Sequence, residues 1–181
     1  MTISVSATAA ATFDAVAVLG FSAIQTVLPM PPGQDSGEGV IVERGQRVEE
    51  LDTSVTTDIF QYGFHLDDVP AGLVDADLDG YPIREQVPMW GSSGIPSCAV
   101  TMLAPGVIAS EAARVVVPVF IAAGERDVVP DLHAEPAAYS ASRDVTVYEL
   151  SGSAHMHNFA GSRQVLWDRL DGWIQSVLLR G

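Results

Sequence analysis

Three short runs of consecutive apolar residues stand out along the chain, at residues 15–20, 115–122 and 145–150. Apolar residues follow one another in these runs and do not alternate with polar ones. That pattern is typical of strands buried on both faces of a parallel sheet. The sequence therefore predicts three parallel strands at these positions.

Segments with helical character lie beside the predicted strands. We expect helices over residues 2–11, 108–114 and 135–142, and the clearest pattern is at the carboxyl end, where Leu166, Leu170, Trp173 and Val177 fall at helical spacing on one face. Trp173 is expected in the core. Strands alternating with helices predict an α/β fold, with a mostly parallel sheet, helices and right-handed crossovers.

A long segment rich in Pro, Gly and Asp interrupts this alternation between the first and second strands. It is too long for a simple crossover, so we predict a core made of residues 1–29 and 106–181 and a lid insertion at residues 30–105. Helical stretches at 47–61 and 71–77 would place the lid over the carboxyl edge of the sheet, where ligands bind in such folds. The mixed aromatic and acidic residues 62–70 are expected to pack inside the lid.

The composition narrows the range of partners. The chain has 48% hydrophobic residues, and its 9 basic residues, all arginine, are outnumbered by 23 acidic ones, for a net charge of −14. Such a charge repels phosphate backbones and anionic lipids, so we expect neither nucleic acid nor a membrane as partner.

Cysteine content and the amino-terminal sequence bear on the compartment. Cys98 is the one cysteine, which excludes an intrachain disulfide and a zinc site built on thiolates. The amino terminus lacks the charged region of a signal peptide, and no apolar run approaches the ~18 residues of a membrane span. The sequence therefore predicts a cytoplasmic protein.

An acid and a histidine follow two of the predicted strands. Asp127 lies in the turn after the second strand, and His155 lies in a loop of small residues after the third, 28 positions later. This distance accommodates a turn, a helix, a strand and a loop, so both side chains are expected at the same edge of neighbouring strands. An acid at that place can orient a histidine for proton transfer.

The segments PVFIAAGERDVVP and VTVYELSGSAHMHNF resemble the last two core strands of the α/β-hydrolase fold, whose catalytic triad runs Ser, then Asp or Glu, then His along the chain. The resemblance covers residues 115–181. It implies that Asp127 orients His155, that His155 is the general base, and that the substrate is a small ester-like molecule attacked by a serine. No cofactor is implied.

The serine nucleophile of such an enzyme lies on a sharp turn between strand and helix, usually as G-x-S-x-G. The nearest match, Gly20-Phe21-Ser22-Ala23-Ile24, departs from the pattern at Ile24, and the prolines from Pro29 onward end any following helix. Residues 15–20 look more like the strand after the nucleophile helix, and residues 2–11 like its remainder. We therefore expect the nucleophile upstream of Met1, with Ser22 as the alternative; residues 91–94 read as a lid loop.

Several alternatives stay open at the level of the sequence. Loss of the neighbouring strand would leave the first strand with an unpaired edge, which predicts aggregation, marginal stability or a homodimer through that edge. The chain is either an ester or acyl hydrolase or a non-catalytic relative that binds a small apolar ligand or a partner chain. A third interpretation is metal binding by His155 and His157, with Asp131 or His133; because spacing fixes no third ligand, no metal is expected.

Overall fold

The computed structural model describes residues 1–10, 12–34, 57–79, 89 and 101–179. In these residues a sheet of three strands has the order β1 (Val16–Leu19), β2 (Val119–Arg126) and β3 (Val145–Ala154), and both neighbouring pairs are parallel. The predicted α/β class with a parallel sheet is confirmed.

The strand limits differ from the apolar runs. β2 begins at Val119 because Pro118 has no N–H to give to a ladder; its carbonyl accepts the N–H of Val16 at 2.9 Å. Val115 is fully buried beside α5 (Ala109–Ala112), whereas Val116 is exposed, so this part of the run packs as a turn. β3 continues through Gly152 to Ala154, beyond the predicted end at residue 150.

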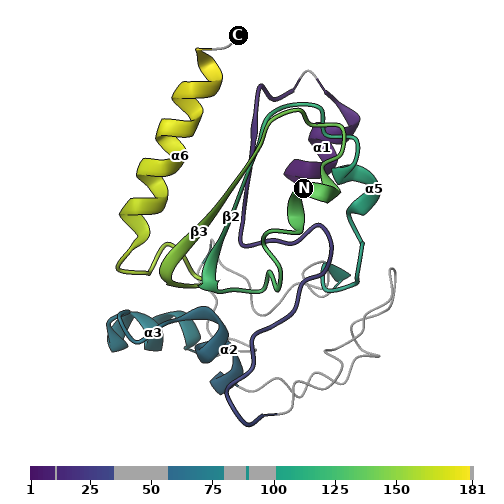
Figure 1. The fold of residues 1–181 in the computed structure, drawn as a ribbon. Coiled ribbons are helices and arrows are strands. Elements are labelled where there is room, and N and C mark those ends of the chain that lie inside the picture. The colour runs from purple at the N-terminus through teal and green to yellow at the C-terminus, as the bar shows by residue number, and fades with distance from the viewer. Residues whose placement is uncertain (11, 35–56, 80–88, 90–100, 180–181) are drawn as a thin grey trace.

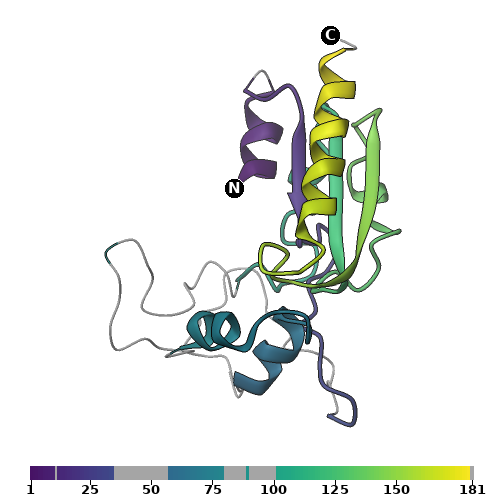
Figure 2. The same ribbon diagram turned by 90° about the vertical axis from the view of Figure 1, so that its left-hand side faces the viewer.

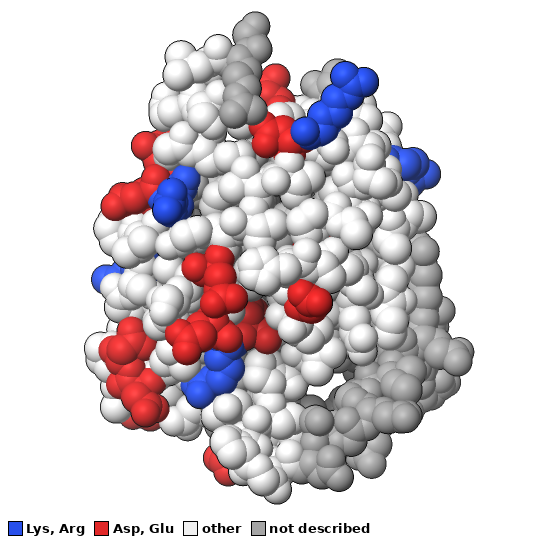
Figure 3. Space-filling model, viewed as in Figure 1, with Lys and Arg blue, Asp and Glu red and all other residues white. Residues whose placement is uncertain are grey.

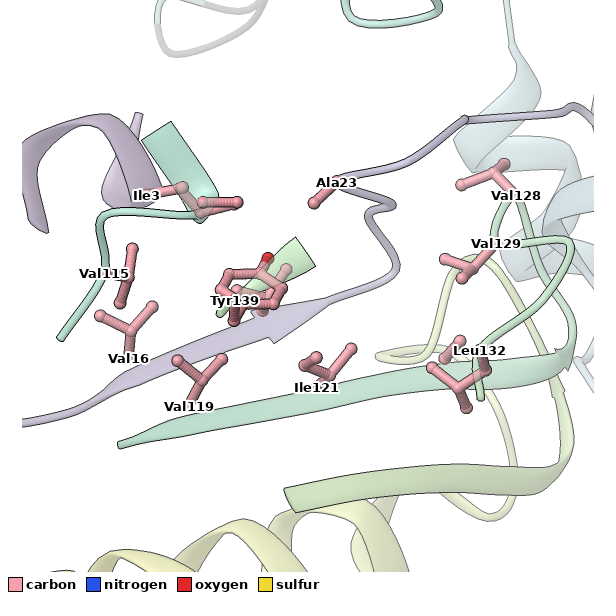
Figure 4. Packing of buried hydrophobic residues seen from close by; sticks show 13 residues of the cluster. Ile3, Val16, Ala23, Val115, Val119, Ile121, Val128, Val129, Leu132 and Tyr139 are labelled. Carbon is pink, nitrogen blue, oxygen red and sulfur yellow. The ribbon is translucent and has the colours of Figure 1, made fainter. Parts of the chain in front are cut away.

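One face of the sheet is covered by short helices. α1 (Thr2–Thr8), α5 and the 3-10 turn η2 (Glu135–Ala138) pack there. In Figure 4, Ile3 of α1 meets side chains of β1, β2 and the connecting segments in one apolar cluster, which includes Ile3, Val16, Ala23, Val115, Val119, Ile121, Val128, Val129, Leu132 and Tyr139. The expected helix at 135–142 is a single turn, because Tyr139 leaves helical geometry with ψ at 48°.

The other face is covered by α6 (Arg163–Leu178), which runs along β2 and β3 (Figure 2). Leu166 and Trp173 pack on Phe120, Ala122 and Leu150, with Leu170 and Val177 beside them. The helical stripe predicted from the sequence is therefore the buried one, and Trp173 lies in the core as expected.

Two helices, α2 (Thr57–Phe64) and α3 (Ala71–Leu78), lie at the carboxyl ends of the strands (Figure 1). Their own small core consists of Phe60, Val69, Val74 and Leu78. α3 matches the predicted helix at 71–77. Of the helix predicted at 47–61, residues 47–56 lie outside the described residues, as does the loop predicted at 91–94.

Charge is unevenly distributed on the surface. On the face seen in Figure 3, carboxylates gather near the middle and arginines are few, as the net charge of −14 leads one to expect. None of the helices among the described residues is both long and apolar enough to cross a membrane.

Candidate active site

Asp127 directly follows the last residue of β2. Its side chain has 0% exposure. Two backbone N–H groups donate to the carboxylate, that of Gly124 in β2 to Oδ2 at 2.8 Å and that of Val128 to Oδ1 at 2.7 Å. Each carboxylate oxygen thus accepts one backbone N–H and keeps a lone pair for a further donor.

His155 directly follows the last residue of β3, and its Nδ1 lies 2.8 Å from Oδ1 of Asp127. An ionised carboxylate can only accept hydrogen bonds, so Nδ1 carries a proton, and in the neutral form of the ring the lone pair is then on Nε2. The imidazole is 27% exposed. The structure brings together the two residues that the sequence singled out and leaves a basic nitrogen on the exposed imidazole.

A second histidine binds the same carboxylate. Nε2 of His157 lies 2.7 Å from Oδ2 of Asp127, and the His157 side chain is 9% exposed. A tight turn, in which the His157 N–H donates to the carbonyl of His155 at 2.9 Å, brings both rings to Asp127. The sequence considered His157 as a metal ligand and missed this role. The available signal was the H-x-H spacing within reach of one acid.

The electrostatics of Asp127 follow from these contacts. Burial alone would raise the pKa of this carboxyl, because it penalises the charged form. The hydrogen bonds from His155 and His157, the attraction of the His155 ring and the N–H of Gly124 outweigh burial and hold the pKa of Asp127 well below its usual range. The carboxylate is therefore ionised at neutral pH.

Two glycines allow the elements around the site to approach closely. A Cβ on Gly20, whose φ is +60°, would lie 3.1 Å from both His155 Nδ1 and His157 Cε1, so the end of β1 closes over the two rings. A Cβ on Gly124 would lie 2.6 Å from the carbonyl oxygen of Ser153. Gly124 lies in β2, where the register shift toward Arg126 brings the end of β3 close.

The end of α2 docks on the histidine loop. The N–H of His155 donates to the carbonyl of Gly63 at 3.2 Å, and the N–H of Met156 donates to that of Phe64 at 3.0 Å. The Phe64 ring lies 4.9 Å from the His155 ring, centroid to centroid. Phe64 therefore gives the basic nitrogen an aromatic neighbour.

Ser22 makes contacts of another kind. It is 3% exposed, and its hydroxyl donates to Oε1 of Glu135 while accepting the N–H groups of Ile24 at 3.1 Å and Gln25 at 2.8 Å. Oε2 of Glu135 accepts the N–H of Ala23 at 2.8 Å. No helix follows Ser22 within residues 22–34. These bonds engage the hydroxyl in bracing the turn after β1, and His155 takes no part in them.

The additional metal ligands considered from the sequence, Asp131 and His133, lie on the surface. The described residues contain no group of three or more His, Cys, Asp or Glu side chains able to hold an ion. Asp131 and His133 are exposed, and Asp131 caps the N–H of Ala134 at 3.1 Å.

No family model matches the chain, and no curated protein matches it. A similar solved structure comes from work on "LipS and LipT, two metagenome-derived lipolytic enzymes". The alignment covers 97% of this chain and 60% of that one, with 14% identity and a TM-score of 0.48. This chain thus spans less than two thirds of the neighbour's length, and a likeness of this size assigns it no activity.

Proposed function

We propose that this chain is the carboxyl-terminal part of an α/β-hydrolase that cleaves small esters or related acyl compounds, with Asp127 as the orienting acid and His155 as the general base. The observation that carries the proposal is the 2.8 Å bond between Asp127 Oδ1 and His155 Nδ1. It joins a buried, ionised carboxylate to an imidazole whose Nε2 is free to accept a proton.

The chemistry of these two groups is that of acyl transfer. Nε2 of His155 takes the proton from a serine hydroxyl as its oxygen attacks the ester carbonyl carbon, and then delivers that proton to the departing alkoxide. Water, activated in the same way, releases the acid and restores the serine. Asp127 stabilises the imidazolium that exists between these steps, and backbone N–H groups hold the oxyanion.

Ser22 does not supply the nucleophile in this proposal, because the Ser22 hydroxyl donates to Glu135. We place the nucleophile upstream of Met1, as the departure from G-x-S-x-G at Ile24 predicts. Residues 30–105 form the lid in this proposal, and α2 and α3 are its described part. The protein acts in the cytoplasm on a small ester-like substrate without a cofactor.

The test begins with the DNA upstream of the Met1 codon, translated in frame. We expect it to encode a G-x-S-x-G segment, and the extended chain to hydrolyse p-nitrophenyl esters. Asp127→Asn and His155→Gln should each lower kcat by about 10³-fold or more. The exposed His133→Gln serves as the control and should leave the rate unchanged.

Labelling with a fluorophosphonate then identifies the nucleophile by mass spectrometry. Label on the upstream serine supports the proposal. Label on Ser22 would assign the nucleophile to this chain and contradict its placement upstream. An ester hydrolysis rate that does not depend on His155 would refute the roles given to the two residues.

The engagement of Ser22 also favours a second candidate, a non-catalytic relative that binds a small apolar ligand or a partner chain. It predicts a stop codon upstream with no serine motif, no labelling by the fluorophosphonate, and a melting temperature that rises with an apolar ester or acid. A melting temperature unmoved by such ligands would count against small-molecule binding.

A further inference from the structure

We propose that His157 is a positioning residue, which holds the Asp127 carboxylate from the side opposite His155 and thereby moderates the basicity of His155. The proposal rests on the function proposed above for its catalytic meaning. The structural relationship itself can be tested without any hydrolytic activity.

The geometry gives the carboxylate a complete set of donors. Oδ1 accepts the Val128 N–H and His155 Nδ1, and Oδ2 accepts the Gly124 N–H and His157 Nε2, all at 2.7–2.8 Å. The two backbone donors fix the turn, and the two imidazoles fix the plane of the carboxylate between them. Without His157, Oδ2 would keep the Gly124 N–H and lose its second donor.

The bond from His157 also shares the charge of Asp127. Each N–H that binds a carboxylate draws negative charge toward itself, which leaves less to stabilise an imidazolium at His155. His157 supplies the second hydrogen bond to Oδ2, beside that of the Gly124 N–H. Its buried ring, whose centroid lies 6.3 Å from that of His155, keeps water from this side of the acid.

The other ionisable groups around the cluster have partners of their own. Arg126, next to Asp127, lies over the Tyr62 ring at 3.9 Å and donates to the carbonyl of His65. His65 on the segment after α2 pairs with Asp77 at 2.9 Å. Gly20 and Phe64, which close the remaining sides, carry no charge. Among the residues that the structure describes, His157 is thus the ionisable side chain that shares Asp127 with His155.

A measurement on the wild-type chain tests whether both histidines donate to Asp127. Two-bond ¹H–¹⁵N spectra of the ¹⁵N-labelled chain report which ring nitrogen of each histidine carries the proton. We expect opposite tautomers, Nδ1–H for His155 and Nε2–H for His157, because an ionised Asp127 needs a donor from each. A wild-type His157 protonated on Nδ1 alone overturns the proposal even if every variant fails to fold.

Two variants test the effect on His155. His157→Phe keeps a ring and removes the donor, whereas His157→Gln keeps an N–H near the place of Nε2. By NMR titration, we expect the pKa of His155 to rise by about half a unit or more in the Phe variant and to return at least halfway in the Gln variant. An unchanged pKa with Phe, or an equal rise with Gln, overturns the proposal.

The same variants in the extended chain connect the proposal to catalysis. The pH profile of kcat/KM should move by the same amount as the pKa of His155. If the titrations succeed but no ester is hydrolysed, the role of His157 stands and the proposed function fails. If esters are hydrolysed but the pKa of His155 does not change in the variants, the proposed function stands and the role of His157 fails.

Discussion

Asp127 is a carboxylate without solvent contact, so its ionised form depends on its four N–H donors. Its pKa in the folded chain lies below the value of about 4 expected in the unfolded chain. A depressed folded pKa stabilises the protein fully above pH ~4, and this stabilisation is lost as the pH falls toward the folded value.

We therefore expect Asp127→Asn to destabilise the chain by about 2–4 kcal/mol at neutral pH, because the amide presents its own N–H to N–H donors in a buried place. The difference in free energy of unfolding between variant and wild type should become smaller as the pH is lowered from 5 toward 2 or 3, as long as the chain stays folded. Urea unfolding at successive pH values measures it. The matched control is Asp14→Asn at an exposed position. A stability difference for Asp127→Asn that does not depend on pH would contradict the lowered pKa of Asp127.

Gly124 and Gly172 provide a pair of opposite predictions. In Gly124→Ala the new Cβ would meet the Ser153 and Ala154 carbonyl oxygens at 2.6 and 2.7 Å, and these are backbone atoms that cannot move aside. We expect a loss of about 1–3 kcal/mol and displacement of the His155 loop. Gly172→Ala in α6 meets no atom within 4 Å and should stabilise by about 0.5–1 kcal/mol. Thermal unfolding of both variants tests whether Gly124→Ala lowers and Gly172→Ala raises the stability of the chain.

At the scale of elements, the Ser22–Glu135 pair ties the turn after β1 to η2. Glu135 is 1% exposed and accepts from the Ser22 hydroxyl and the Ala23 N–H, while the pKa of the neighbouring Tyr139 is raised by burial and by the Glu135 charge. A buried carboxylate with two donors braces one element against another. The turn it fixes carries Gly20, which packs on both site histidines.

A double-mutant cycle tests this brace. We expect Ser22→Ala to lower the free energy of unfolding by about 1–2 kcal/mol and Glu135→Ala by about 2–3 kcal/mol, because each variant leaves the polar group of its partner unpaired. The coupling energy between the two substitutions should be about 1 kcal/mol or more. In the extended chain, Ser22→Ala should keep most of the ester hydrolysis. Complete loss of hydrolysis in a folded Ser22→Ala chain would instead make that serine the nucleophile.

The elements differ in how far their limits can be predicted from the sequence. The stripe on α6 was predictable because a long amphipathic helix repeats its pattern over several turns. The limits of β2 and β3 were not predictable, because Val115 is buried although it lies outside β2, and Gly152 lies inside β3 although glycine is typical of turns. Apolar runs report burial, whereas the strand limits depend on Pro118 and on the close approach at Gly124.

At the scale of the molecule, the order of strands and helices led to the pairing of Asp127 with His155, because parallel strands bring their carboxyl ends to one edge. The contacts of His157, Phe64 and Glu135 could not be predicted in this way. Each joins segments whose relative placement depends on tertiary packing, such as the docking of α2 on the histidine loop. Chain order thus predicted that Asp127 and His155 would meet, whereas the contacts around them depend on tertiary packing.

The remaining feature of the whole molecule is the outer edge of β1, which in the described part of the chain has a strand neighbour on one side, β2. The N–H groups of Val16 and Gly20 donate to β2, so by alternation that of Ala17 points away from it. Arg169 of α6 lies over Tyr148 of β3, so the opposite flank of the helix, with exposed Trp167, Ile174 and Leu178, faces the β1 side. A strand edge that no described strand pairs with, beside an apolar flank, favours association.

We therefore propose that this chain self-associates through β1, and we expect its mass by light scattering to rise with concentration. Ala17→Pro removes an N–H that β2 does not use, and should shift the chain toward monomer while retaining the sheet's circular dichroism. Ala17→Ser keeps the N–H and serves as the control, with association like that of the wild type. A wild-type chain that stays monomeric and unfolds independently of concentration would mean that this edge is covered within the chain itself, and would argue against the open strand that an upstream nucleophile implies.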